Sequence, residues 1–367
     1  MQALVHRLPT AAPHDVSALH AAIDAGAIRP EAIVAVLGKT EGNGCVNDFT
    51  RGYATSALKQ AIAARLGQTP ETVERRVAFV MSGGTEGGLS PHWLVFEVRD
   101  APAPPPGAPK ALAIGVAFTP TLPPEAIGRQ AQATATATAV REAMARARIA
   151  APADVHYVQI KCPLLTKARI AEAESRGQTV ATQDTYMSMG YSRGASALGV
   201  AQALGELGGT PPSDAAVCAD LALFSGVASA SAGIEMMENQ IMVLGNSAAW
   251  SGDLVIGHGV MADAIDVAAA GAALAAVGIE LAAPLDETAR ARIAAVLCKA
   301  EPSQSGLIRG RRHIMLDDSD IHASRHARAL VGGVLAGVFG DTQLFVSGGA
   351  EHQGPDGGGP LAVIARR

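Results

Sequence analysis

Short apolar runs rich in β-branched residues alternate with longer, Ala-rich stretches along the chain. Three of the apolar runs close on a lysine: IVAVLGK on Lys39, VHYVQIK on Lys161 and IAAVLCK on Lys299. Runs of this length and composition, bounded by polar residues, are typical of buried β-strands. Each is preceded by another strand-like run and then a helix-like segment; these earlier strand-like runs are QALVHRL, ALAIGVAF and DLVIGHGV. The pattern therefore predicts one order of elements three times.

A helix-like segment follows each lysine run, and it opens with Thr or Ser followed by Arg. The segments are TRGYATSALKQAI, SRGASALGVAQAL and SRHARALVGGVLAG. Their hydroxyl residues are predicted N-caps, because a side-chain oxygen can accept from the free N–H groups of the first turn; these are Thr50, Ser192 and Ser324. The arginines at the predicted helix starts are Arg51, Arg193 and Arg325. The positive end of the helix dipole does not favour arginine there, which indicates a task other than helix stability.

A third recurring phrase is FVMSGGTEGG at 79–88, which returns as FVSGGAEHQG at 345–354. In both, a serine has Gly two residues later and Glu four residues later; these serines are Ser82 and Ser347. Two serines compete for the middle copy. Ser225 shares the preceding Phe and the following Gly, whereas Ser231 shares the later Gly and Glu, so we select Ser231.

The three copies predict three α+β domains around a pseudo-threefold axis, with a central β-barrel-like core. Corresponding serines lie 116 and 149 residues apart, which is the size of a domain rather than of a solenoid repeat. A Pro-rich stretch at 101–110 and a polar, Gly-containing stretch at 245–253 are predicted linkers. The predicted domains are residues 1–104, 111–249 and 253–367. A content of 49% hydrophobic and 17% charged residues suits such a packed protein.

Composition and charge exclude several classes of function. The net charge is -5 and no basic run occurs, so we expect no nucleic-acid partner. The N-terminus lacks the features of a signal peptide, and the apolar segment 264–283 is interrupted by Asp266 and Glu280, so we expect a cytoplasmic protein without a membrane partner. The cysteines and histidines form no zinc motif, and we expect reduced thiols at Cys45, Cys162, Cys218 and Cys298.

Three sets of Lys, Arg and Ser indicate acyl-transfer chemistry. Taken singly, each Lys or Arg is an ordinary surface charge and each Ser an ordinary turn residue, but their joint recurrence favours one shared site. A neutral lysine can take the proton of an attacking serine, and small residues beside the serine leave N–H groups free for an oxyanion. Paired arginine donors suit a ligand with several carbonyl or enolate oxygens. The inferred reaction is hydrolysis of a cyclic amide of near-threefold symmetry.

The chain resembles the cyanuric acid hydrolase and barbiturase family of ring-opening amidohydrolases. The resemblance rests on GKTEGNGCVNDFTRGYA, FVMSGGTEGG, SMGYSRGASALG, ASASAGIEM, VLCKAEPS and VSGGAEHQGPDGGGP, in order along essentially the whole chain. It implies three similar repeats with the active site between them, and opening of the cyanuric acid ring to carboxybiuret and then biuret. A barbiturase is an alternative within the family; the compact length and lack of a zinc-like cluster favour cyanuric acid. A non-catalytic binder of small anionic rings is an alternative from another class.

The resemblance also implies roles for individual residues. Ser231 is the expected nucleophile and Lys161 the expected base. The expected substrate contacts are Arg51, Ser82, Gly83, Arg193, Ser231, Ala232, Arg325, Ser347 and Gly348, with Lys39 and Lys299 helping to bind the ring. A structural Mg²⁺ or Ca²⁺ is implied at Glu301, Ala350, Gln353, Gly354, Pro355 and Gly358, an all-oxygen ligand set suited to these ions. The resemblance implies no organic cofactor. It implies a homotetramer.

The sequence offers its own argument for the middle pair. Lys39 is followed two residues later by Glu41, and Lys299 by Glu301. If the strands continue that far, these carboxylates lie on the same face as the lysines and hold their protons. Lys161 is followed by Cys162 and Pro163 instead, so we expect it to be the lysine best able to be neutral.

Overall fold

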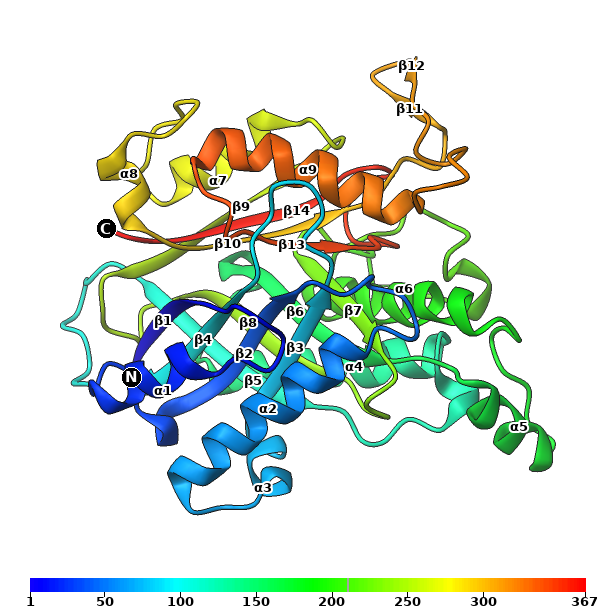
Figure 1. Ribbon diagram of the computed structural model, residues 1–367, viewed down its shortest axis with the longest axis horizontal. Helices are drawn as coiled ribbons and strands as arrows, with labels where there is room; N and C mark the ends of the chain where they lie inside the picture. The colour runs from blue at the N-terminus through cyan, green and yellow to red at the C-terminus, as the bar shows by residue number, and fades with distance from the viewer. Residues whose placement is uncertain (210) are drawn as a thin grey trace.

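The computed structural model describes residues 1–209 and 211–367, and these contain three four-stranded mixed sheets, one from each predicted repeat (Figure 1). In each sheet the first strand of the repeat pairs with the fourth, the fourth with the second, and the second with the third. The strands, in spatial order, are β1 (Gln2–Pro9), β4 (His92–Arg99), β2 (Ile33–Thr40) and β3 (Ala78–Gly83); β5 (Ala111–Phe118), β8 (Gln240–Ser247), β6 (Val155–Pro163) and β7 (Ala228–Gly233); and β9 (Leu254–Met261), β14 (Gly359–Arg366), β10 (Ile293–Ala300) and β13 (Phe345–Gly348). The threefold repetition of one plan is confirmed, while the domain boundaries themselves stay predictions.

Helices cover the outer faces of these sheets, and a short hairpin of β11 (Leu307–Ile308) and β12 (Arg311–Arg312) projects from the third repeat (Figure 1). The helices are α1 (Ser17–Asp24), α2 (Phe49–Leu66) and α3 (Pro70–Glu74) in the first repeat; α4 (Gln130–Arg146), α5 (Lys167–Ser175) and α6 (Thr185–Leu204) in the second; and α7 (Val267–Ala276), α8 (Glu287–Arg292) and α9 (Ala323–Phe339) in the third. Short 3-10 turns at Pro30–Ala32, Pro124–Ala126, Pro152–Asp154 and Asp214–Ala216 complete the regular structure.

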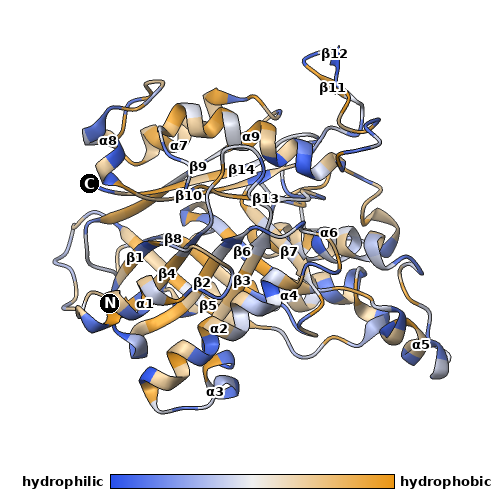
Figure 2. Ribbon diagram, viewed as in Figure 1, coloured by the Kyte–Doolittle hydropathy of each residue, from blue (hydrophilic) through white to orange (hydrophobic). Residues whose placement is uncertain are grey.

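The inner faces of the three sheets share one hydrophobic core. Buried side chains of all three repeats belong to it, among them Leu37, Tyr157 and Leu297, each from the strand that carries its repeat's lysine. The strands are accordingly the most hydrophobic part of the ribbon, whereas polar residues gather on peripheral helices such as α5 and α8 (Figure 2). Each sheet forms its own hydrogen-bonded unit, and the three sheets pack around this core. This packing points one end of each lysine strand at the other two repeats.

Three local predictions about the helices and linkers were wrong. The N-caps are Asp48, Asp184 and His322, whose side chains accept from first-turn N–H groups, rather than Thr50, Ser192 and Ser324. Carboxylate caps satisfy those donors and also complement the positive helix end. Because α6 starts so early, Arg193 is its ninth residue, not a helix-start residue. The stretch 245–253 is a linker only after Ser247, where β8 ends.

The apolar segment 264–283 contains α7, a helix of 10 residues that buries one face. Among residues 1–209 and 211–367, no helix is both long and apolar enough to cross a membrane. All four cysteines are free thiols, as predicted.

Candidate active site

Strand pairing explains why lysine and serine recur together. The second and third strands of each repeat run parallel, joined by a helical crossover, so their carboxyl ends lie at the same edge. At that edge each lysine stands directly opposite a serine. The pairs are Lys39 with Ser82, Lys161 with Ser231, and Lys299 with Ser347. We call these pairs the first, second and third corner. The choice of Ser231 over Ser225 is consistent with this register.

The three corners interlock around a common centre. Each lysine is fully buried and donates to the carbonyl of the residue before the serine of a neighbouring repeat. The distances from Nζ to oxygen are 2.7 Å for Lys39 to Val346, 3.0 Å for Lys161 to Met81 and 2.8 Å for Lys299 to Ala230. The hydroxyls of Ser231 and Ser347 are 3.0 Å apart. The corners therefore form one site with pseudo-threefold symmetry.

Contacts within the corners differ in detail. Nζ of Lys39 donates to Oγ of Ser82 at 3.4 Å, and Nζ of Lys299 donates to Oγ of Ser347 at 3.2 Å. In the second corner, within the residues that the structure describes, the hydrogen bond of Lys161 goes to the Met81 carbonyl and the hydroxyl of Ser231 pairs with that of Ser347. At the second corner, therefore, the described lysine and serine each bond to a residue of another repeat rather than to each other.

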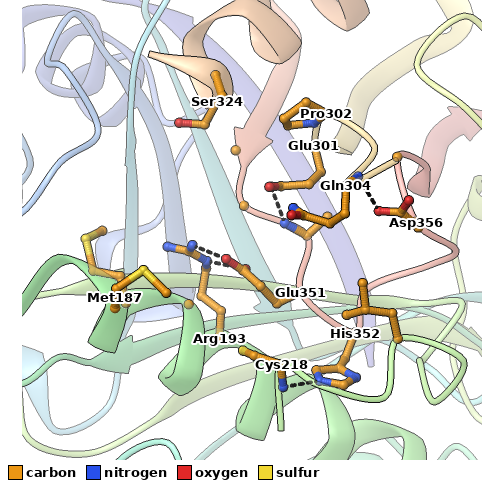
Figure 3. A pocket seen from close by; sticks show the side chains of 18 of the residues that line it. Met187, Arg193, Cys218, Glu301, Pro302, Gln304, Ser324, Glu351, His352 and Asp356 are labelled. Carbon is orange, nitrogen blue, oxygen red and sulfur yellow. Dashed lines mark hydrogen bonds and ion pairs between the residues drawn. The ribbon is translucent and has the colours of Figure 1, made fainter. Parts of the chain in front are cut away.

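Two arginines clamp glutamates of the next repeat through both carboxylate oxygens. Arg193 on α6 donates to Glu351 at 2.7 and 2.5 Å, as Figure 3 shows, and Arg328 on α9 donates to Glu86 at 2.8 and 2.5 Å. Glu351 and Glu86 are the residues four positions after Ser347 and Ser82. Two of the three boundaries between repeats therefore carry the same bidentate ion pair.

The third boundary, where α2 meets the second repeat, is built differently. Arg51 donates from Nη1 to the carbonyl of Ala232 at 2.9 Å and from Nη2 to that of Cys45 at 2.5 Å. Its Nε lies 3.8 Å from Oδ2 of Asp48. The glutamate of the second corner, Glu235, is instead 2.8 Å from Nζ of Lys161.

Arg328, which the sequence reading missed, occupies in the third repeat the place of Arg51 and Arg193. Arg325, the predicted residue, lies one turn earlier and has no carboxylate within ion-pair distance in the described ranges. A signal for Arg328 was present: it shares the apolar stripe of α9 with Val331 and Leu335, so the helical period turns it inward. A small residue also follows each of the three equivalent arginines.

Burial lowers the pKa of all three lysines. For Lys39 the next cause is the charge of Arg328, and the pKa lies well below its ordinary value. For Lys299 burial and then Arg193 lower the pKa to about 7. For Lys161 burial lowers the pKa while Glu235 opposes the shift. Burial would raise the pKa of Glu235, but Lys161 and Arg51 together outweigh it and lower this pKa to about 2.

The expectation that Lys161 is the lysine best able to be neutral therefore loses its basis, because Glu235 lies 2.8 Å from its Nζ. Strand periodicity does not extend to Glu41 and Glu301, because β2 and β10 end at Thr40 and Ala300. The carboxylate that reaches Lys161 comes from the turn after β7, four residues beyond the serine. Contact across a turn cannot be read from strand periodicity.

A cavity of about 690 Å³ lies against the site between the second and third repeats (Figure 3). Arg193, Arg328 and Gly348 line its inner wall, and Tyr186 and His322 meet at its outer side with Oη and Nε2 2.8 Å apart. The cavity thus leads from the surface to two arginines of the site and to the backbone beside Ser347.

The predicted metal loop forms another wall of this cavity. Glu301 lies beside Ala350, whose N–H donates to its carboxylate at 2.8 Å (Figure 3). Burial, and then the nearby Glu351, raise the pKa of Glu301 to about 7. A half-buried carboxylate with one N–H donor, whose pKa is raised in this way, suits a hard cation, which would supply positive charge beside it. The side chain of Gln353 is engaged elsewhere, so it could contribute only its carbonyl, as could Gly354, Pro355 and Gly358.

A sequence model described as "Amidohydrolase ring-opening protein" matches residues 4–366. The chain belongs to this family. The match covers all three repeats and therefore every corner of the site. The chain is thus a hydrolase acting on cyclic amides, and the resemblance stated from the motifs is confirmed.

Relatives match from end to end. The cyanuric acid amidohydrolase of Ectopseudomonas oleovorans is 60% identical and that of Azorhizobium caulinodans 58% identical, with 100% of this chain covered in both cases and 100% and 98% of the relatives. A solved cyanuric acid hydrolase superimposes with a TM-score of 0.95 at 52% identity, covering 100% of this chain and 99% of the other. The cyanuric acid hydrolase structure from A. caulinodans gives 0.92 at 58% identity, with the same coverage. The predicted repeat fold is confirmed.

Proposed function

We propose that the protein opens the ring of cyanuric acid by hydrolysis. The carrying observation is the set of three interlocked Lys–Ser corners, whose threefold arrangement matches the threefold symmetry of that ring. Full-length relatives that bear the name cyanuric acid amidohydrolase, at 54 to 60% identity, support the same substrate. Backbone N–H groups beside the serines and the guanidinium groups of three arginines would bind the three ring oxygens.

In this proposal Ser231 attacks one ring carbonyl while Lys161 takes the hydroxyl proton. Collapse of the tetrahedral intermediate breaks the C–N bond, and Lys161 returns the proton to the departing ring nitrogen. Water then attacks the acyl group on Ser231, giving its proton to Lys161, and Ser231 leaves with that proton. The product is carboxybiuret, which loses carbon dioxide to give biuret.

The groups of the first and third corners would bind the ring rather than attack it. Lys39 and Lys299 would each donate to the ring, together with Ser82 and Ser347 and the backbone at Gly83, Ala232 and Gly348. Arg51, Arg193 and the newly found Arg328 would enclose its edge. Arg325, the residue expected from the sequence, lies one turn before Arg328, which contacts Glu86. A contact between Arg325 and the substrate stays a prediction.

A parallel assay tests the proposal. Purified protein is incubated with cyanuric acid and, separately, with barbituric acid, and the formation of biuret and the loss of each ring are measured. We expect biuret to form and barbituric acid to be largely untouched. Comparable turnover of barbituric acid would assign a barbiturase, and tight binding without turnover would assign a binding protein.

Three further expectations belong to the proposal. Glu301 and the 350–358 loop would hold Mg²⁺ or Ca²⁺, which supplies positive charge and ties the third lysine strand to its serine turn. A homotetramer is expected, and light scattering after size exclusion tests it. A cytoplasmic location is expected, and fractionation of producing cells tests it.

A further inference from the structure

The second corner departs from the symmetry of the other two in the partner of its glutamate. At the first and third corners the glutamate four residues after the serine gives both oxygens to an arginine. At the second corner, Glu235 gives Oε1 to Lys161 at 2.8 Å, an ion pair in which that oxygen accepts no well-directed hydrogen bond. One lysine of three therefore has a carboxylate to itself.

Asp48 lies against Arg51 at the boundary where Arg51 does not clamp Glu235. The carboxylate of Asp48 is buried and held by N–H donors of Gly44 at 2.8 Å and Thr50 at 3.0 Å, and it faces Nε of Arg51 at 3.8 Å. Asp48 stands three residues before its arginine. The residues at the same offset before Arg193 and Arg328 are Gly190 and Arg325, neither of which is an acid.

We propose that Glu235 is the positioning residue that equips Lys161, and neither other lysine, to accept the proton of the nucleophile. This inference rests on the proposed Ser231–Lys161 chemistry. When Oγ of Ser231 bonds to the ring carbon, its proton moves to Nζ of Lys161, and the ammonium that forms lies against the carboxylate of Glu235. Glu235 stays ionised throughout, as the aspartate of a Ser-His-Asp triad does. Asp48 keeps Glu235 free for this task by holding Arg51.

Burial alone would leave Lys161 a weak base. The charged or titratable groups that act on Lys161 are Glu235 from the turn after β7, Arg51 from α2 and Cys162 from its own strand, and Arg169 of α5 interacts with Glu235. Burial and Arg51 lower the pKa of Lys161, and Glu235 is the main group that raises it. At the other corners the matching glutamates are each shared with an arginine.

The pH profile of kcat/KM tests this role. Glu235→Gln keeps the size of the side chain and removes its charge, which favours neutral Lys161. The acidic limb of the profile should therefore move to lower pH by about one unit or more, while kcat falls at least about tenfold because the new ammonium has lost its counter-charge. Glu235→Asp, which restores a carboxylate, should bring the limb back towards its wild-type position.

Glu86→Gln is the matched control at the first corner. It should lower kcat/KM, because Arg328 loses its partner, and leave the acidic limb where it is in the wild type. Asp48→Asn retains an N-cap acceptor for α2 but releases Arg51 towards Glu235. It should shift the limb in the same direction as Glu235→Gln, by less, and should add nothing in the double variant.

The outcomes separate this inference from the proposed function. An inactive Ser231→Ala protein together with an unmoved limb in Glu235→Gln would overturn the role of Glu235 alone. An active Ser231→Ala protein would overturn the Ser231–Lys161 chemistry itself. If Glu235→Gln does not fold, as judged by circular dichroism, Asp48→Asn decides the question, because it leaves Glu235 in place; an unmoved limb there contradicts the inference.

Discussion

The second and third corners are made from the same parts and differ in one connection. In both, a buried lysine stands opposite a serine on a parallel strand, and a glutamate follows the serine by four residues. At the third corner Arg193 takes both oxygens of Glu351, whereas at the second Arg51 binds backbone carbonyls and leaves Glu235 to Lys161. Under the proposed function, a symmetric set of groups would bind a symmetric ring, and this one changed partner would select one serine for attack.

The largest effect on turnover is expected at the proposed nucleophile and its base. Ser231→Ala and Lys161→Ala should each abolish turnover, because the attacking oxygen or its base is lost. Ser82→Ala and Ser347→Ala remove hydroxyls that bind and should retain measurable activity. Steady-state rates of the four variants decide this, with circular dichroism as the check that each one folds.

Trapping of the acyl group adds an independent test of the same prediction. Mass spectrometry of quenched reactions should find the adduct on the peptide that carries Ser231. An adduct on the peptide of Ser82 or Ser347 would assign the attack to an outer corner and end the distinction between the corners.

A smaller effect is expected at the arginine clamps. Arg328→Ala should lower kcat/KM roughly 30-fold, which corresponds to about 2 kcal/mol of transition-state stabilisation. The variant leaves Glu86 without its partner and removes a guanidinium from the edge of the ring. Arg325→Ala, one turn away on the same helix, is the matched control and should have a clearly smaller effect. Equal losses in the two variants would show that α9 contributes to the site as a whole rather than through Arg328.

The repeats and the pairing of lysine with serine could be predicted because they depend on local pattern. A strand, a crossover helix and a parallel strand bring two carboxyl ends to one edge, so Lys161 and Ser231 meet by topology alone. The partners across repeat boundaries could not be predicted in this way. Arg328 with Glu86 spans 242 residues, and nothing local in the sequence specifies which of two arginines on α9 turns inward except its register with the apolar stripe.

The helix starts show the same limit. Thr50 and Ser192 have the chemistry of N-caps, but Asp48 and Asp184 lie upstream and cap α2 and α6 more effectively. The carboxylate partner of Lys161 was missed for a similar reason. Glu235 lies in a turn, where the strand period of two no longer applies. Errors of this kind concentrate at the site because its geometry is set by contacts between repeats.

A third prediction concerns a feature that the third corner has and the first lacks. Glu301 is half-buried beside the 350–358 loop, whereas Glu41, at the same offset from its lysine, is exposed. Removing metal with a chelator should lower Tm by several degrees, because a bound ion stabilises only the folded state. Glu301→Gln should lower Tm and remove the response to chelator, and Glu41→Gln should keep it. Elemental analysis that finds no metal in the purified protein would contradict the site.

The smallest expected effect is at the residue after each serine. The first and third corners have Gly83 and Gly348 there, where a Cβ would overlap Asp48 and Arg328, while the second has Ala232. The contact that Ala232 makes with Arg51 is through its carbonyl at 2.9 Å, so Ala232→Gly should keep kcat/KM within about twofold. Loss of a buried methyl and added backbone freedom should lower stability by about 1 kcal/mol. Kinetics and thermal unfolding of this variant measure both quantities. A tenfold loss of kcat/KM would mean that the methyl group itself helps to hold Ser231 in position, and that the second corner differs from the others by more than the partner of its glutamate.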